Sequence, residues 1–114
     1  CEAIDYGNQR AKLAYDMFAY KIRTLIGSYD VAMGGLDAVV FTGGIGENGA
    51  RIRKSVAEDM EFLGIELDDK LNQAAPGGSF ADVTAKDGKV AVLVIPTNEE
   101  LVIATETKEI VEAL

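Results

Sequence analysis

Apolar residues recur at helical spacing through the first third of the chain. Six of them are separated by three or four positions: Ala14, Phe18, Ile22, Leu25, Tyr29 and Met33. Charged residues fall between them, so the pattern predicts one long amphipathic helix over residues 9–33 whose apolar stripe faces the core. Gly34 and Gly35 are expected to end this helix, because glycine readily adopts the left-handed conformation that closes many helices.

Two later runs are apolar without polar alternation. Residues 38–41 read AVVF and residues 90–95 read VAVLVI, a composition typical of strands buried on both faces of a sheet. A weaker pattern predicts a short edge strand over residues 80–84, whereas residues 71–79 have the polar, glycine-containing composition of a loop. Strands and helices in this order indicate an α/β fold.

Two further helices are expected. One spans residues 50–60, with Asn48 well placed as its N-cap. Its first turns carry Arg51, Arg53 and Lys54, where positive charge opposes the helix dipole. A nearby anion would relieve this arrangement, and solvated surface charge is the alternative for at least two of the three. The other helix starts at Thr97 or Asn98, with its apolar residues toward the core.

The first strand runs directly into the glycine-dense turn TGGIGEN, residues 42–48. Three glycines in four positions leave little side chain to keep a ligand away from the backbone. A strand-to-helix turn of this kind offers free N–H groups to a phosphate or a polar ring. We interpret it as a nucleotide site; a tight connection whose glycines serve only turn geometry and packing is the alternative.

A second polar segment, Thr97 to Glu100, follows the second strand. Thr97 and Glu100 have capping-box spacing, which gives Glu100 a structural role and leaves Glu99 free to face a ligand. If the two strands are parallel neighbours, the glycine turn and Glu99 share one rim of the sheet, because ligands collect at the carboxyl ends of parallel strands. These residues would then fit a nucleotide bound at the turn with Mg²⁺ near Glu99. The alternative is that Glu99 is an ordinary first-turn glutamate that binds no metal.

Composition narrows the function classes. The net charge of −8 over 114 residues argues against a nucleic-acid partner, and no run of 18 apolar residues suggests a membrane span. The single cysteine, Cys1, suits a reducing cytoplasm. The absence of histidine removes histidine catalysis and histidine metal ligands, so any metal here is a hard cation held by oxygen. The chain begins without Met, and we expect it to be part of a longer protein.

The stretches DAVVFTGGIGENGARIRKS and VLVIPTNEELVIA resemble the C-terminal part of the acetate kinase family. The preceding RAKLAYDMFAYKIRTLIGSYDVAMGGL is also similar in order and spacing, so the likeness covers nearly the whole chain. This family belongs to the superfamily of sugar kinases, heat-shock ATPases and actin. The resemblance implies an α/β ribonuclease-H-like (actin-like ATPase) fold, with residues 1–114 forming the C-terminal part of the nucleotide-binding domain and an amino-terminal domain absent.

The resemblance also implies an activity. Family members transfer the γ-phosphoryl group of ATP to acetate, reversibly and with Mg²⁺, and form homodimers. The implied nucleotide contacts are Gly43, Gly44, Ile45, Gly46 and Asn48, with Gly44, Ile45 and Asn48 at the base and ribose. Glu99 is the implied magnesium residue.

Two departures from the family pattern matter. The family often has Ser where this chain has Gly49, and its catalytic Arg and His residues have no positions here. Because phosphoryl transfer depends on positioning from both sides of a cleft, we predict that these 114 residues alone are inactive.

Other functions stay open. Gly44, Gly46 and Gly49 satisfy G-x-G-x-x-G, and acidic residues at 66, 68 and 69 lie about 20 positions on, as in a dinucleotide-binding module. A non-catalytic assembly piece is a second alternative. A relative that acts on propionate or butyrate is a third.

Overall fold

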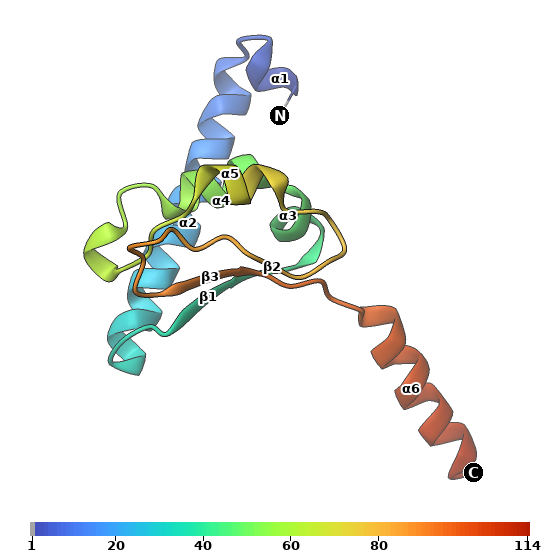
Figure 1. Cartoon of the computed structure of the whole chain (residues 1–114). Helices are drawn as coiled ribbons and strands as arrows, with labels where there is room; N and C mark the ends of the chain where they lie inside the picture. The colour runs from blue at the N-terminus through green and yellow to red at the C-terminus, as the bar shows by residue number, and fades with distance from the viewer. Residues whose placement is uncertain (1) are drawn as a thin grey trace.

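The computed structural model describes residues 2–114 (Figure 1). Its elements along the chain are α1 (Glu2–Asp5), α2 (Gln9–Met33), β1 (Ala38–Phe41), α3 (Gly43–Asn48), α4 (Ala50–Ala57), the 3₁₀ turn η1 (Glu61–Leu63), α5 (Asp69–Ala74), β2 (Ala81–Asp82), β3 (Ala91–Val94) and α6 (Glu99–Glu112). Both long strands, the short edge strand and three of the helices begin where the apolar pattern predicts them or within two residues of it.

The three strands form one sheet in the order β1-β3-β2. β1 and β3 are parallel neighbours, with Ala38 opposite Ala91 and Phe41 opposite Val94, and β2 runs antiparallel to β3. The condition on which the shared rim depends is therefore confirmed: both strands end at the same edge.

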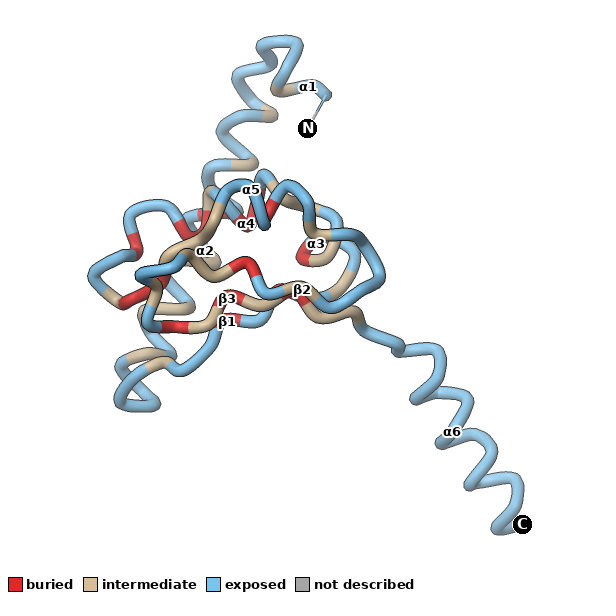
Figure 2. Tube along the Cα trace, in the orientation of Figure 1, coloured by how far each residue is buried: buried red, intermediate tan, exposed pale blue. Residues whose placement is uncertain are grey.

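Helices cover one face of this sheet. Val39, Phe41, Val92 and Val94 are buried, and Figure 2 shows the buried positions gathered between the sheet and the helices. On the opposite face Val40 is 47% exposed. The expectation that both faces of the strands are buried is therefore wrong, because alternate residues of these strands lack a covering layer in the part of the chain described.

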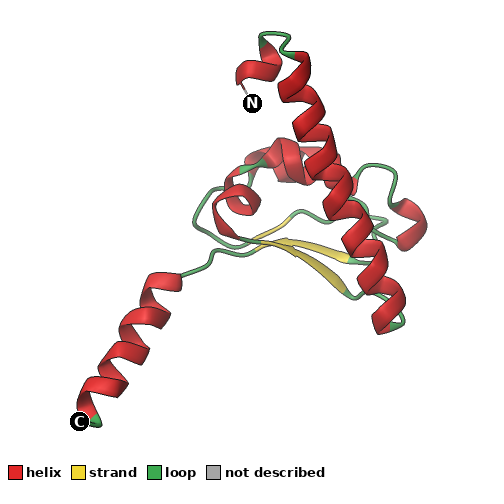
Figure 3. Cartoon of the chain, turned by 180° about the vertical axis from the view of Figure 1, so that it is seen from behind, coloured by secondary structure: helices red, strands yellow, loops and turns green. Residues whose placement is uncertain are grey.

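Helix α2 has the predicted bounds. Asn8 caps its start by accepting from the N–H groups of Arg10 and Ala11, and Gly34 ends it in the left-handed conformation with φ 77°. Seen from behind, α2 runs the length of the body beside the sheet (Figure 3).

The packing face of α2 differs from the predicted stripe. Ala19 is buried, and Tyr15, Ile22 and Ile26 pack against the core. Of the six predicted positions only Ile22 belongs to this face; the other five, at positions 14, 18, 25, 29 and 33, are exposed. The sequence pattern could not separate the two faces, since apolar side chains occupy both.

Helix α4 begins at Ala50 as predicted and ends at Ala57, three residues early. Its Ile52 and Val56 are buried in the core. Asn48 does not cap it: that residue is the last of α3, and the N-cap position of α4 is Gly49.

Helix α5 lies where a loop was predicted. Asp68 caps it, its Oδ1 accepting from the N–H groups of Lys70 and Leu71 at 2.8 and 3.0 Å. The loop prediction is wrong for residues 71–74, because this cap and the burial of Asn72 stabilise a helix of weak intrinsic propensity.

Helix α6 does not pack against the core. It projects away from the body and has no buried residue (Figures 1 and 2). The capping box between Thr97 and Glu100 does not form either; Asn98 caps the helix by accepting from the N–H of Leu101 at 3.0 Å. Within residues 2–114, no helix combines the length and the apolarity that crossing a bilayer requires.

Candidate functional site

The glycine segment after β1 is the short helix α3 and not an open turn. Gly43, its first residue, has φ 68°, a conformation that glycine adopts without strain. Gly46 is buried against β1, where an added Cβ would lie 3.0 Å from the carbonyl carbon of Phe41. The prediction of a turn is wrong over residues 43–48, since this close contact between α3 and β1 favours a helix that glycine alone would not.

The parallel strands bring α3 and the start of α6 together. An open pocket of about 380 Å³ is lined by Gly43, Gly44 and all four residues from Thr97 to Glu100. The predicted nucleotide residues Gly43 and Gly44 thus share one pocket with the predicted magnesium residue Glu99. Both glutamates line it, so the separate structural role expected for Glu100 has no support.

A direct contact joins the two segments. Glu47, in α3, accepts through Oε1 from the backbone N–H of Thr97 at 3.0 Å. Two of the residues lining the pocket, Glu99 and Glu100, are acidic and none is basic. An anionic phosphate would be repelled here unless a cation lay between it and the carboxylates, and a hard cation with oxygen ligands meets that need.

The acidic side chains of the described residues do not form a metal site by themselves. Among residues 2–114, no three acidic side chains converge closely enough to hold a metal ion by themselves. A magnesium ion in this pocket would therefore need further ligands such as waters or phosphate oxygens.

Gly44 also lines a second pocket. It measures about 360 Å³ and is lined mainly by apolar and aromatic side chains: Tyr15, Phe18, Gly44, Ile45, Asn48, Gly49, Arg51 and Ile52. Ile45 is 63% exposed, and Asn48 donates through Nδ2 to the carbonyl of Gly44 at 3.0 Å. Arg51 lies over the Tyr15 ring, 5.4 Å from its centroid. An apolar pocket of this size suits a planar heterocycle.

Arg53 differs from its two basic neighbours. Arg51 and Lys54 are exposed and form ion pairs with Asp5 and Asp69, which also raises the pKa of Lys54. Arg53 is 1% exposed, and burial lowers the pKa of its guanidinium. The prediction of solvated surface charge for at least two of the three basic residues is therefore confirmed, with Arg51 and Lys54 as the two. The position of Arg53 three residues before Val56, on the buried side of α4, is the sequence feature that could have indicated its burial.

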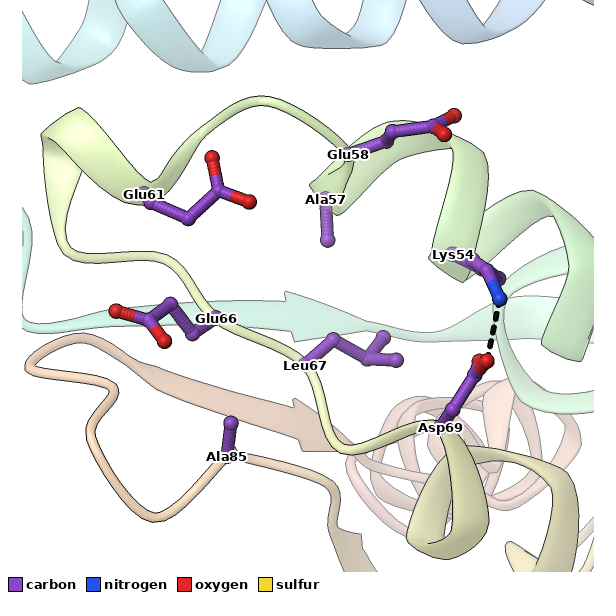
Figure 4. Close-up of a pocket in the computed structure, with 8 residues that line it drawn as sticks. All are labelled: Lys54, Ala57, Glu58, Glu61, Glu66, Leu67, Asp69 and Ala85. Carbon is purple, nitrogen blue, oxygen red and sulfur yellow. Dashed lines mark hydrogen bonds and ion pairs between the residues drawn. The ribbon is translucent and has the colours of Figure 1, made fainter.

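A third pocket is formed by residues outside the glycine segment. Figure 4 shows it between α4, η1 and α5, with Glu61, Glu66 and the Lys54–Asp69 ion pair around it. None of its lining residues belongs to residues 43–48 or to the start of α6. Two of the acids expected in a dinucleotide-binding module have structural roles instead, since Asp68 caps α5 and Asp69 pairs with Lys54.

Comparison with known proteins decides between these interpretations. The sequence profile described as the Acetokinase family matches residues 1–105. The chain belongs to the acetokinase family. The resemblance seen in the sequence is thereby confirmed, and the dinucleotide-binding alternative is not supported.

Curated acetokinase relatives match nearly the whole chain. It is 55% identical over 111 residues to an acetate kinase of Methanosarcina acetivorans, and 49% identical over 112 residues to one of Thermoanaerobacterium thermosaccharolyticum. These alignments cover 97% and 98% of this chain but 27% and 28% of the relatives. The chain therefore spans about a quarter of the length of the acetate kinases that it matches.

Solved structures agree on the fold. The acetate kinase of Porphyromonas gingivalis superposes with a TM-score of 0.84 at 45% identity, covering 96% of this chain and 27% of that one. A propionate kinase of Francisella tularensis gives 0.78 at 38% identity, covering 92% and 26%. The fold is accordingly the α/β ribonuclease-H-like fold of the actin-like ATPase superfamily.

Proposed function

We propose that this chain forms the C-terminal part of the nucleotide-binding domain of an acetate kinase. The complete enzyme would transfer the γ-phosphoryl group of ATP to acetate reversibly, giving acetyl phosphate and ADP. The observation that carries the proposal is the parallel pairing of β1 with β3, through which Gly43, Gly44 and Glu99 line one pocket.

The two pockets beside Gly44 suggest a division of the nucleotide. The adenosine part would occupy the apolar pocket, against Gly44, Ile45 and Asn48. Gly44 lines both pockets, so the phosphates would extend past it toward the acidic one. Gly43 and Gly44 are both free of steric obstruction, because nothing lies within 4 Å of an added Cβ at either position.

Glu99 would hold the Mg²⁺ that accompanies the phosphates. When bound, Mg²⁺ supplies charge neutralisation at the transferring group. Of the chain's own groups, Glu47 orients the Thr97 backbone next to this carboxylate, and Asn98 fixes the first turn of α6. The chain contains no histidine, and in this proposal the groups that contact the acyl substrate would come largely from the rest of the complete enzyme.

A calorimetric titration of the chain with ADP, with and without Mg²⁺, tests the nucleotide site. We expect saturable ADP binding that tightens with Mg²⁺, and no binding of NADH as the matched control. NADH binding without ADP binding would overturn the proposal.

A chimera tests the activity. The chain replaces the matching 27% of the Methanosarcina acetivorans acetate kinase, to which it is 55% identical. We expect the chimera to phosphorylate acetate with Mg·ATP, whereas the 114-residue chain alone shows no turnover. A folded chimera that binds Mg·ATP but phosphorylates no carboxylate would contradict the proposal.

A propionate-directed enzyme is the second candidate, because the Francisella propionate kinase shares this fold at 38% identity. Activity of the complete protein on acetate, propionate and butyrate distinguishes the two.

We also propose a cytoplasmic homodimer. A single cysteine suits a reducing compartment, and α2 exposes several large apolar side chains that a second copy could cover. Sedimentation of the complete protein tests the dimer.

A further inference from the structure

The side chain of Arg53 connects three helices. From α4, its Nη1 donates to the carbonyl oxygens of Gly46 and Glu47 at 2.7 and 2.9 Å. Its Nε and Nη2 donate to Oδ1 and the carbonyl oxygen of Asn72, in α5, at 2.7 and 2.9 Å. A planar guanidinium with donors along two edges suits this arrangement, which a lysine ammonium could not reproduce.

Asn72 completes the network. It is fully buried, with 0% exposure, and its Nδ2 donates to the carbonyl oxygen of Ala50 at 2.8 Å. The Asn72 side chain therefore accepts from Arg53 and also fixes the first residue of α4. Every buried side-chain nitrogen and oxygen in residues 2–114 has a hydrogen-bond partner.

The carbonyls bound by Arg53 lie at the carboxyl end of α3. The other end of this six-residue helix supplies Gly43 and Gly44 to the acidic pocket. Gly43 and Gly44 lie within one helical turn of Gly46 and Glu47, so hydrogen bonds that hold Gly46 and Glu47 also restrain the two glycines before them. The positive guanidinium additionally compensates the partial negative charge of the free carbonyls at this helix end.

We propose that Arg53 and Asn72 are positioning residues for the nucleotide-binding segment, and that they hold α3 where its glycines line the two ligand pockets. This inference rests on the proposed function. Neither residue lines either of these pockets, so both act through α3 and not by touching the nucleotide.

The test compares two substitutions that should both lower stability, one within the Arg53–Asn72 network and one outside it. Asn72→Ala removes one acceptor of Arg53 and the link to Ala50. Val83→Ala, the matched control, shortens a fully buried side chain beside the sheet. ADP affinity is measured by calorimetry well below the melting temperature of each variant, and hydrogen exchange of α3 is followed by mass spectrometry.

We expect Asn72→Ala to weaken ADP binding about tenfold, because small misplacements of a supporting group cost affinity at this scale. Exchange in α3 should accelerate in this variant. Val83→Ala should leave ADP affinity within about twofold of the parent and α3 exchange unchanged, since a loss of global stability alone does not alter the folded site. Asn72→Asp keeps an oxygen acceptor for Arg53 but loses the donor to the Ala50 carbonyl, so it should recover only part of the lost affinity.

The outcomes separate the two proposals. Equal effects of Asn72→Ala and Val83→Ala on affinity and on α3 exchange would overturn the positioning role. If neither the parent chain nor the chimera binds ADP, the proposed function fails, and α3 exchange alone then decides the positioning role. If Asn72→Ala does not fold, Asn72→Gln takes its place, because the longer side chain displaces the same acceptor.

Discussion

The backbone N–H of Thr97 donates to Oε1 of Glu47 at 3.0 Å, and this hydrogen bond joins the two segments that line the acidic pocket. The Thr97 hydroxyl contacts the same oxygen at 3.4 Å. This one carboxylate therefore holds the start of α6 beside α3. Helix α6 itself has no residue buried against the body.

Replacing Glu47 should loosen this connection. We expect Glu47→Ala to weaken Mg·ADP binding about fivefold, because the loss of one hydrogen bond to a charged acceptor costs about 1.5–3 kcal/mol and is partly offset by water. Glu47→Gln keeps an oxygen acceptor and serves as the control. Calorimetric titration measures both; equal weakening would show that charge, and not the bond to Thr97, is what matters.

The two neighbouring glutamates should differ in their response to magnesium. We expect Glu99→Gln to abolish most of the tightening of ADP binding by Mg²⁺, and Glu100→Gln to leave most of it in place. In the chimeric kinase, Glu99→Gln should likewise lower Mg²⁺-dependent turnover far more than Glu100→Gln. Since both side chains line the pocket, matching losses in the two variants would end the assignment of the metal to Glu99.

Two glycines should separate binding from stability. At Gly44 an added Cβ meets no atom within 4 Å, so Gly44→Ala should keep or raise stability by about 0.5–1 kcal/mol, as alanine favours a helix. It should nevertheless weaken ADP binding, because the methyl group enters the space shared by both pockets.

At Gly49 an added methyl group should instead lower the stability of the fold. An added Cβ would overlap the carbonyl oxygen of Ile45 and lie 2.6 Å from Cγ2 of Ile52, so Gly49→Ala should destabilise the fold by about 1–3 kcal/mol. Urea denaturation of both variants measures this difference. Gly27→Ala, in an open position on α2, is the control.

Acid should weaken one local contact near β2. The Thr84 hydroxyl, and then the Thr84 backbone N–H, donate to Oδ1 of Asp82 and lower the pKa of that carboxyl below its ordinary value. The stabilisation is therefore fully present above about pH 4, the ordinary pKa of an unfolded aspartate, and is lost as pH falls through the lower folded pKa.

Melting temperatures across pH test this contact. Asp82→Asn should melt below the parent at pH 7, and the gap should close as the pH drops below about 4. Thr84→Ser keeps the hydroxyl and should preserve the pH dependence. A constant gap across this range would contradict the assignment.

Local pattern predicted the regular elements well. The bounds of α2 and β1 follow from helical spacing, an apolar run and a glycine pair, each of which acts over a few residues. The shared rim of Gly43, Gly44 and Glu99 was also predictable, because it needs only two buried parallel strands and the rule that their carboxyl ends meet.

Contacts made at long range were not predictable in the same way. Glycine disfavours helix, yet α3 forms because Gly46 packs on Phe41 and Arg53 binds the helix end. Arginine is seldom buried, so composition argued against the position that Arg53 occupies. Its burial depends on acceptors in α3 and α5, and these two segments were predicted as a turn and a loop.

The remaining errors concern surfaces. The apolar residues of α6 predicted a packed helix, but within residues 2–114 nothing covers them. A sequence pattern reports that a face is apolar without saying which part of a protein covers it.

The parallel pairing of β1 with β3 also has a consequence for how the site arises in time. Its closing contact, between Glu47 and Thr97, joins residues 50 positions apart. Contacts of such separation form late, because loop closure costs chain entropy before any pairing repays it. During synthesis α3 therefore leaves the ribosome long before the segment around Thr97. The pocket is completed only after β3 has been translated and inserted beside β1.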